Sequence, residues 1–206
     1  MTGPDDFRAA RDVSRETLDR LTIFEALLRR WTARVNLIAP ATADQIWTRH
    51  ILDSAQLFDL APAGNRWSDL GSGGGLPGLV IAILAAGERP SLAVTLVESD
   101  QRKAAFLATA ARETGIRASF LTDRIESIPD QRADILSARA LAPLPRLLDL
   151  SARHMAPGAT ALFHKGARHD DELRDALAHW RFSYKKHPSL TDPSATILAL
   201  TGVSRV

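Results

Sequence analysis

The sequence predicts an α/β fold with a seven-stranded, mostly parallel sheet, helices on both faces and an N-terminal helical extension. From Arg66 onward, short apolar runs alternate with helical patterns, which is typical of strand–helix–strand units in a parallel sheet. The last two apolar runs are joined by a loop alone and predict an antiparallel hairpin at the C-terminal end. Before Arg66 the apolar residues recur with the period of a helix.

The length and composition set the broad class. A chain of 206 residues favours one compact unit, with a helical extension over residues 1–65 and a cofactor-binding core over residues 66–206. The absence of cysteine excludes disulfide scaffolds, thiolate metal sites and mechanisms with a cysteine nucleophile. Residues 1–6 lack the features of a signal peptide, and the apolar run at residues 79–86 is too short to span a membrane. We therefore expect a cytoplasmic protein.

The individual elements follow from periodicity and capping signals. An apolar stripe over residues 14–31 predicts a helix with Ser14 as its N-cap, and a second helix is predicted from near Thr42. Gly115 predicts the end of a later helix, because glycine favours the left-handed conformation found there. Strands are predicted at 66–70, 92–97, 118–121, 133–138, 159–164, 181–186 and 195–202, and helices at 77–86, 100–114, 143–154 and 169–179.

A glycine-rich loop joins the first predicted strand to the next helix. Residues 71–78 read GSGGGLPG, which lets the backbone turn sharply and lets a ligand approach closely. Pro77 suits the first turn of the helix that follows. The second predicted strand is followed by Glu98, and an acid at that point accepts hydrogen bonds from ribose hydroxyls. Together these features predict a site for the ribose of an adenosine cofactor.

Two cofactors share this arrangement. Gly73, Gly75 and Gly78 satisfy the G-x-G-x-x-G spacing of dinucleotide sites, so an NAD-dependent oxidoreductase stays open as an alternative. Such enzymes normally carry the loop near the N-terminus, whereas more than 60 residues precede it here. The terminal hairpin also fits a methyltransferase sheet better. We therefore expect S-adenosyl-L-methionine as the cofactor.

Six short motifs occur in order over most of the chain, at residues 36–38, 49–54, 69–78, 124–126, 137–141 and 165–166. In these motifs the sequence resembles the bacterial 16S rRNA (guanine-N7) methyltransferases of the glucose-inhibited division protein B family. The resemblance implies a class I methyltransferase (Rossmann-like) fold that binds S-adenosyl-L-methionine. It also implies methyl transfer to N7 of a guanosine in the 530 loop of small-subunit rRNA.

The resemblance and the expected sheet edge place eight residues at the cofactor: Gly71, Gly73, Gly75, Leu76, Glu98, Ile125, Glu126 and Arg139. Ile125 and Glu126 are expected to border the adenine, with Asp123 as a nearby alternative. Arg139 follows the fourth predicted strand, at the edge where reaction centres of open α/β folds lie. We expect it to act by positioning, although an arginine there can equally pair with a neighbouring carboxylate.

Five residues are expected on the RNA side: Asn36, Arg49, His50, Asp53 and Lys165. In this hypothesis the first four form the wall between the extension and the active site, and Lys165 meets an RNA phosphate. No metal is expected, because His50 and Asp53 have no further ligands clustered near them. Residues 139–206 carry ten cations against six anions, which favours this third as an RNA surface. Its candidate contacts are Arg146, Arg153, Lys165, Arg168, Lys185 and Lys186.

The predicted chemistry needs little from side chains. Guanine N7 carries a lone pair and no proton, so positioning rather than a general base is expected to supply the rate. N7 faces the deep, narrow groove of A-form RNA, so the target guanosine is expected in a loop or bulge. We expect a monomer acting on 16S rRNA or the small ribosomal subunit. The alternatives are another S-adenosylmethionine-dependent methyltransferase and an RNA-binding factor with a vestigial nucleotide pocket.

Overall fold

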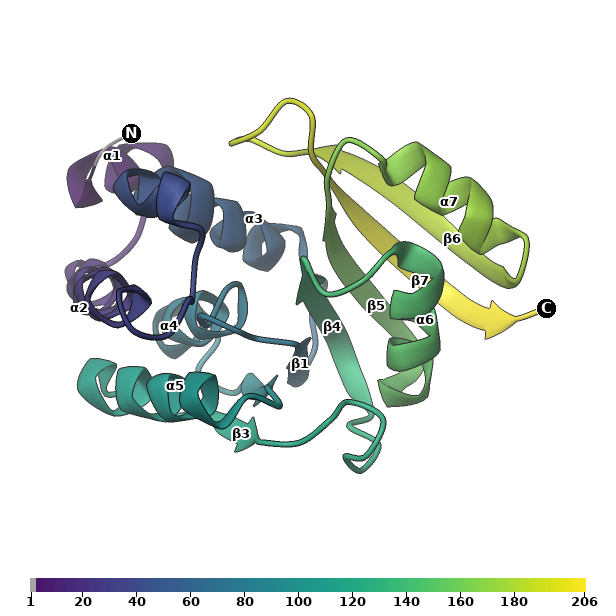
Figure 1. Cartoon of the computed structure of the whole chain (residues 1–206), viewed down its shortest axis with the longest axis horizontal. Coiled ribbons are helices and arrows are strands. Elements are labelled where there is room, and N and C mark those ends of the chain that lie inside the picture. The colour runs from purple at the N-terminus through teal and green to yellow at the C-terminus, as the bar shows by residue number, and fades with distance from the viewer. Residues whose placement is uncertain (1–2) are drawn as a thin grey trace.

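A single seven-stranded sheet forms the centre of the computed structural model, which describes residues 3–206 (Figure 1). The expectation of a cytoplasmic protein rests in part on residues 1–6. Of these, residues 1–2 lie outside the described residues. The strands are β1 (Arg66–Leu70), β2 (Ala93–Val97), β3 (Ser119–Leu121), β4 (Ala133–Arg139), β5 (Met155–Lys165), β6 (Trp180–Pro188) and β7 (Thr196–Arg205). Their order across the sheet is β3-β2-β1-β4-β5-β7-β6.

The strand directions confirm the predicted fold class. β1 to β5 pair with one another in parallel. β7 runs antiparallel to both β5 and β6. All seven strands overlap their predicted ranges. β5 begins at Met155, earlier than predicted, because Met155 pairs with Ala133 before an irregularity in the register.

The helices are α1 (Pro4–Ala10), α2 (Arg15–Thr32), α3 (Asp53–Leu60), α4 (Gly78–Glu88), α5 (Gln101–Thr114), α6 (Leu144–Ser151) and α7 (His169–Leu177). Ser14 is the predicted N-cap of α2, since its side chain accepts the N–H of Thr17. Gly115 ends α5 in the left-handed conformation. The short α1 was not predicted, because Phe7 is its one buried residue. None of the helices within residues 3–206 combines the length and apolar character needed to cross a membrane.

Two hydrophobic clusters occupy the two faces of the sheet. One joins helices α1 to α5 to the strands, and the other lies beneath α6 and α7. Neighbouring strand residues alternate between them, so that Ile135 belongs to the first cluster and Leu136 to the second. Figure 1 shows the N-terminal helices on one side of the strands and α6 and α7 on the other. The extension and the strands share the first cluster, so packing in this cluster sets the position of the extension relative to the strand ends.

The stretch predicted as one helix from Thr42 is built differently. A 3₁₀ segment, η1 (Pro40–Gln45), leads into a π-helical segment, η2 (Ile46–Leu52), and then into α3. A period of 3.6 residues describes neither of the first two, so periodicity located the helix but missed its irregular start. π-helical turns are frequent at functional sites, and η2 carries Arg49 and His50.

Two glycines with similar backbone conformation are expected to differ in how they tolerate alanine. Gly75 has a φ of +79°, and a Cβ there would lie 2.6 Å from Leu79 Cδ1 and 2.9 Å from Leu79 Cβ. Gly115 has a φ of +65°, but a Cβ there would meet nothing within 4 Å. Alanine costs about 1–2 kcal/mol at either position for the left-handed backbone. At Gly75, overpacking adds about 1–3 kcal/mol.

Urea unfolding of Gly75→Ala and Gly115→Ala measures this difference. We expect the free energy of unfolding to fall by about 1 kcal/mol for Gly115→Ala. For Gly75→Ala we expect a loss of at least about 2 kcal/mol. Equal losses in the two variants would contradict the close packing of the loop.

Candidate active site

A buried carboxylate holds the glycine-rich loop against the sheet. Asp69 of β1 is fully buried; its Oδ2 accepts the Gly78 N–H at 3.1 Å and its Oδ1 accepts the Ser137 hydroxyl at 2.7 Å. Trp67 Nε1 donates to the same hydroxyl oxygen at 2.8 Å. Burial raises the pKa of Asp69 to about 6. These bonds connect β1, the start of α4 and β4, a role for Asp69 that sequence reasoning missed.

The loop itself leaves no room for a side chain at its start. Gly71 has a φ of +69°, and a Cβ there would lie 2.7 Å from Leu141 Cδ1. The N–H of Ser72 donates to the Val97 carbonyl at 2.9 Å, which fastens the loop to the end of β2. The glycines therefore expose backbone at the point where three strand ends meet.

A cavity of about 470 Å³ opens above this loop at the carboxyl ends of the central strands. Its volume lies within the roughly 300–1,000 Å³ usual for cofactor sites. Asp123 lines it, as does Lys103, which the sequence analysis did not single out. Six of the eight predicted cofactor residues also line it: Gly71, Gly73, Glu98, Ile125, Glu126 and Arg139. We call this space the glycine-loop cavity.

Glu98 is fixed at the rim of the glycine-loop cavity. Its Oε2 accepts the Gly73 N–H at 2.8 Å, and its Oε1 accepts the Asp100 N–H at 2.8 Å. Each carboxylate oxygen retains a further lone pair, so ribose hydroxyls would find acceptors already held in place. A side-chain-free loop beside this acid fits the adenosine and methionine parts of S-adenosyl-L-methionine.

Two of the predicted cofactor residues, Gly75 and Leu76, lie behind the lining of the glycine-loop cavity. Neither Gly75 nor Leu76 is among the residues that line the glycine-loop cavity. Their N–H groups both donate to the Ser72 carbonyl, at 2.7 Å and 3.2 Å, which closes the turn inward. The Leu76 side chain is buried in the hydrophobic cluster shared with the helices. The bonds to the Ser72 carbonyl shape the loop, and contact of Gly75 and Leu76 with the cofactor stays a prediction.

Arg139 connects the end of β4 to the helical extension. Its Nη2 donates to the Arg49 carbonyl at 2.9 Å and to His50 Nδ1 at 3.1 Å. Its Nη1 lies 3.6 Å from Asp53 Oδ2. Arg139 is therefore paired with a carboxylate, which is the alternative that the sequence left open. Burial lowers the pKa of Arg139, and the Asp53 carboxylate opposes that shift. The extension thus supplies three partners for one guanidinium.

The hydrogen bonds of His50 define its tautomer. The Thr42 hydroxyl donates to the Ala39 carbonyl at 2.8 Å, so it accepts from His50 Nε2, also 2.8 Å away. The proton therefore sits on Nε2, and Nδ1 is free to accept from Arg139. Burial, reinforced by the charge of Arg139, lowers the pKa of His50 to about 4. His50 is a neutral acceptor at neutral pH.

A second cavity, of about 190 Å³, lies on the other side of Arg139. We call it the Asp53 cavity; its walls include Arg49, Asp53, Arg139, His164, Lys165 and Asp192. Arg139 and Ala140 line both cavities. Of the residues expected on the RNA side, Arg49, Asp53 and Lys165 line this cavity. Sequence reasoning missed His164 of β5 and Asp192 of the loop between β6 and β7. Arg49 Nη1 donates to Asp192 Oδ2 at 2.9 Å.

Asp53 is held by hydroxyl and amide groups. Its Oδ1 accepts from Gln56 Nε2 at 3.2 Å, Ser189 Oγ at 3.1 Å and Thr191 Oγ1 at 2.8 Å. Burial alone would raise the pKa of Asp53, but the nearby His164 ring, the Arg139 guanidinium and the Thr191 hydroxyl outweigh it. Its pKa therefore lies well below the usual range, and Asp53 is a carboxylate at neutral pH.

Lys165 is paired within the protein, and its contact with an RNA phosphate stays a prediction. Its side chain is 7% exposed, and Nζ lies 2.6 Å from Glu172 Oε2 and donates to the Ala142 carbonyl at 2.8 Å. The same Glu172 oxygen accepts the Leu144 N–H at 2.7 Å. Lys165 and Glu172 therefore hold the loop after β4, which borders the glycine-loop cavity.

Asn36 is exposed and lines neither cavity. Its neighbour Leu37 packs on the glycine-rich loop, since a Cβ at Gly74 would lie 3.1 Å from the Leu37 carbonyl oxygen. The extension thus touches the loop beside Asn36, and contact of Asn36 with RNA stays a prediction.

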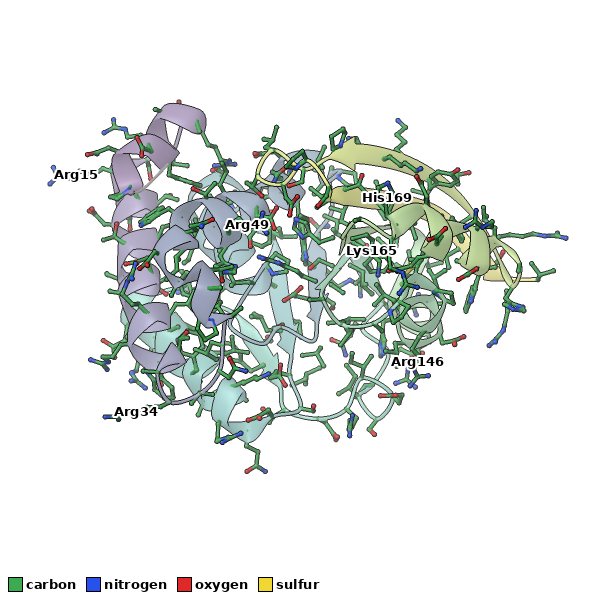
Figure 2. All side chains as sticks on the ribbon, turned by 45° about the horizontal axis from the view of Figure 1, so that its top comes forward. Arg15, Arg34, Arg49, Arg146, Lys165 and His169 are labelled. Atoms are coloured by element: carbon green, nitrogen blue, oxygen red, sulfur yellow. The ribbon has the colours of Figure 1, made fainter. Side chains whose placement is uncertain are left out.

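The basic residues predicted to face RNA are mostly neutralised by neighbours. Four of the six are in ion pairs: Arg146 with Glu126, Arg153 with Asp130, Lys165 with Glu172 and Lys186 with Asp170. Figure 2 shows Arg49 between the N-terminal helices and the C-terminal strands, whereas Arg15 and Arg34 project outward from the extension. The basic charge is therefore spread over both ends of the molecule.

A Rossmann-like sheet with its last strand inserted antiparallel, a glycine-rich loop after β1 and an acid after β2 defines a class I methyltransferase. Solved structures share this fold. A putative O-methyltransferase from Klebsiella pneumoniae has a TM-score of 0.60 and 14% identity, covering 96% of this chain and 95% of that chain. An O-methyltransferase from Bacillus cereus, solved with SAH, has a TM-score of 0.59 and 12% identity, covering 96% of each chain.

Sequence comparison identifies the family. The GidB family model, described as rRNA small subunit methyltransferase G, matches residues 17–198. The Ribosomal RNA small subunit methyltransferase G of Ruegeria sp. (strain TM1040) is 51% identical over 195 residues, covering 95% of each chain. The chain therefore belongs to the rRNA small subunit methyltransferase G family. This membership confirms the predicted class, an rRNA methyltransferase that uses S-adenosyl-L-methionine.

The depressed pKa of His50 predicts acid sensitivity. A folded pKa of about 4 against an ordinary value near 6.5 means that stability from neutral His50 is complete above pH 6.5. It is lost as the pH falls toward 4, by as much as about 3 kcal/mol. His50→Asn keeps an acceptor near the Nδ1 position and cannot be protonated. We expect the free energy of unfolding to fall more steeply in the wild type than in His50→Asn; parallel pH curves would rule this out.

Proposed function

We propose that this protein transfers a methyl group from S-adenosyl-L-methionine to N7 of a guanosine in the 530 loop of 16S rRNA. The observation that carries the proposal is that two cavities adjoin at Arg139 and Ala140. The glycine-loop cavity suits the cofactor, and the Asp53 cavity opens beside it. In this proposal the protein is a cytoplasmic monomer that acts on the rRNA or on the small ribosomal subunit.

The chemistry asks the protein to position rather than to move protons. S-adenosyl-L-methionine supplies a methyl group activated by a positive sulfur, and the N7 lone pair forms the new bond as the carbon–sulfur electrons return to sulfur. No proton leaves N7, so no general base is needed. The groups at the boundary between the cavities agree with this, because Arg139 stays charged and His50 stays neutral. Alignment of the reacting atoms can supply roughly 7–11 kcal/mol.

The helical extension over residues 1–65 and the core over residues 66–206 act as one unit in this proposal. The core provides the glycine-rich loop, Glu98 and Arg139. The extension provides Asp53 and the two groups that accept from Arg139. Asp123, Ile125 and Glu126 are proposed to border the adenine, since all three line the glycine-loop cavity.

Methyl transfer to purified small subunits tests the proposal directly. We expect label from S-[methyl-³H]adenosylmethionine to enter small subunits that lack the modification, and mapping to place it on guanine N7 in the 530 loop. Gly71→Val, which would collide with Leu141, serves as the inactive control. Label at another atom would indicate a different methyltransferase, and RNA binding without label would indicate a non-enzymatic RNA-binding factor.

Binding to the small subunit is expected to depend on salt. Arg124 is exposed and lines the glycine-loop cavity, whereas Arg117 is exposed at the opposite edge of the sheet. The logarithm of the binding constant should fall linearly with the logarithm of the salt concentration. Arg124→Ala should reduce that slope by about 1, while Arg117→Ala should leave it unchanged. A binding constant that is flat with salt, or equal slopes in both variants, would remove this edge from the RNA contact.

A further inference from the structure

Unpartnered polar groups gather around the Asp53 cavity. Among the described residues, Arg139 Nη1 and both ring nitrogens of His164 are buried without a hydrogen-bond partner. The His164 side chain is 7% exposed and forms part of the cavity wall. Two of these atoms, Arg139 Nη1 and His164 Nε2, lie 3.6 Å and 3.4 Å from Asp53 Oδ2 without a hydrogen bond. Buried polar atoms are nearly always hydrogen-bonded, so this wall retains hydrogen-bonding capacity for a polar ligand.

The carboxylate in this wall has one oxygen in use and one directed at the unpartnered groups. Three donors bind Asp53 Oδ1. Oδ2 lies 3.6 Å from Arg139 Nη1 and 3.4 Å from His164 Nε2, but neither nitrogen makes a hydrogen bond with it. Asp53 therefore offers a charged acceptor in a fixed orientation.

We propose that the Asp53 cavity receives the guanine base of the RNA substrate, with Asp53 Oδ2 accepting from its N1–H and 2-amino group and Arg139 Nη1 donating to its O6. This inference rests on the proposed function and assigns the base-reading residues of the same site. Bases that undergo chemistry are commonly taken out of the stack and read through hydrogen bonds to their Watson–Crick edge.

Size and charge favour a base over a phosphate. About 190 Å³ is several times the roughly 30 Å³ share of a water molecule, yet below the range for whole cofactors. The Arg49 and Lys165 cations of the same wall are paired with Asp192 and Glu172, so an RNA phosphate in this space would also face carboxylates, among them that of Asp53. A neutral, planar group that donates and accepts hydrogen bonds meets no such repulsion.

The position of Arg139 sets the orientation of the base. Arg139 and Ala140 separate the two cavities, and O6 of guanine lies between N7 and N1 around the ring. With O6 on Arg139, N7 faces the glycine-loop cavity, and N1 and the 2-amino group face Asp53. The same placement puts the carboxylate near the purine ring as it becomes positively charged on methylation.

This arrangement discriminates against adenine, which also has an N7. Adenine presents an unprotonated N1 and a 6-amino group, so a lone pair would face Asp53 and a donor would face Arg139. An asparagine at position 53 would weaken the discrimination against adenine, because its amide can donate to adenine N1. Discrimination between the two purines therefore reports on Asp53 separately from general stability.

The test compares Asp53→Asn with the wild type on small subunits that carry either guanosine or adenosine at the mapped nucleotide. We expect kcat/KM on guanosine to fall at least about tenfold, and the preference for guanosine over adenosine to narrow at least about tenfold. The dissociation constant of S-adenosyl-L-methionine should stay within about twofold. The matched control is Asp44→Asn, which alters a carboxylate whose side chain is 100% exposed. This variant should behave as wild type.

A second measurement uses the unaltered protein and so does not depend on the variant's folding. Small subunits carrying inosine, which lacks the 2-amino group, should show kcat/KM at least about tenfold below guanosine. Equal rates on inosine and guanosine would overturn the proposal, as would equal proportional losses on guanosine and adenosine in Asp53→Asn. Failure of the wild type to methylate guanosine at N7 would instead overturn the proposed function, so the two failures are distinguishable.

Discussion

The active site depends on the contacts of the Arg139 guanidinium, which belongs to a partly buried side chain. A cation in a low-dielectric interior is costly unless dipoles or opposite charges compensate it. At the end of β4 those partners are the Arg49 carbonyl, His50 Nδ1 and the Asp53 carboxylate, all from the helical extension. Hydrophobic packing positions the extension, and the bonds of Arg139 join it to the end of β4 at the boundary between the two cavities. The neutral state of His50 belongs to the same arrangement, because a protonated ring would repel the guanidinium.

Local patterns were enough to predict most of the sheet, and they drew attention to the glycine-rich loop and Glu98, which meet at the glycine-loop cavity. The strands, the loop over residues 71–78 and Glu98 follow one another closely in sequence, so their spacing carries the information. His164 and Asp192 escaped prediction because their meaning arises only when distant segments meet around Asp53. The ion pair of Lys165 escaped prediction for a related reason. A lysine after a strand is usually solvated, and its partner Glu172 lies on the next helix, outside any local motif.

The loop after β4 shows how strain and anchoring are combined at the site. Ala140 has a φ of +51°, a conformation that costs a non-glycine residue about 1–3 kcal/mol. Arg139 fixes the loop on one side, and the Lys165–Glu172 pair holds the Ala142 carbonyl and the Leu144 N–H on the other. A rigid peptide between the cavities is what alignment of a methyl donor with a nucleophile requires.

The donors to Asp53 Oδ1 have a consequence for biosynthesis. Asp53 is synthesised early, whereas Ser189 and Thr191 lie near the end of the chain. Domains generally fold as units. The glycine-rich loop, Glu98 and Arg139 are present well before Ser189 emerges from the ribosome. The second cavity is therefore complete only when the final hairpin closes over Asp53. The cavity proposed to receive the RNA base is thus the last part of the site to be completed during synthesis.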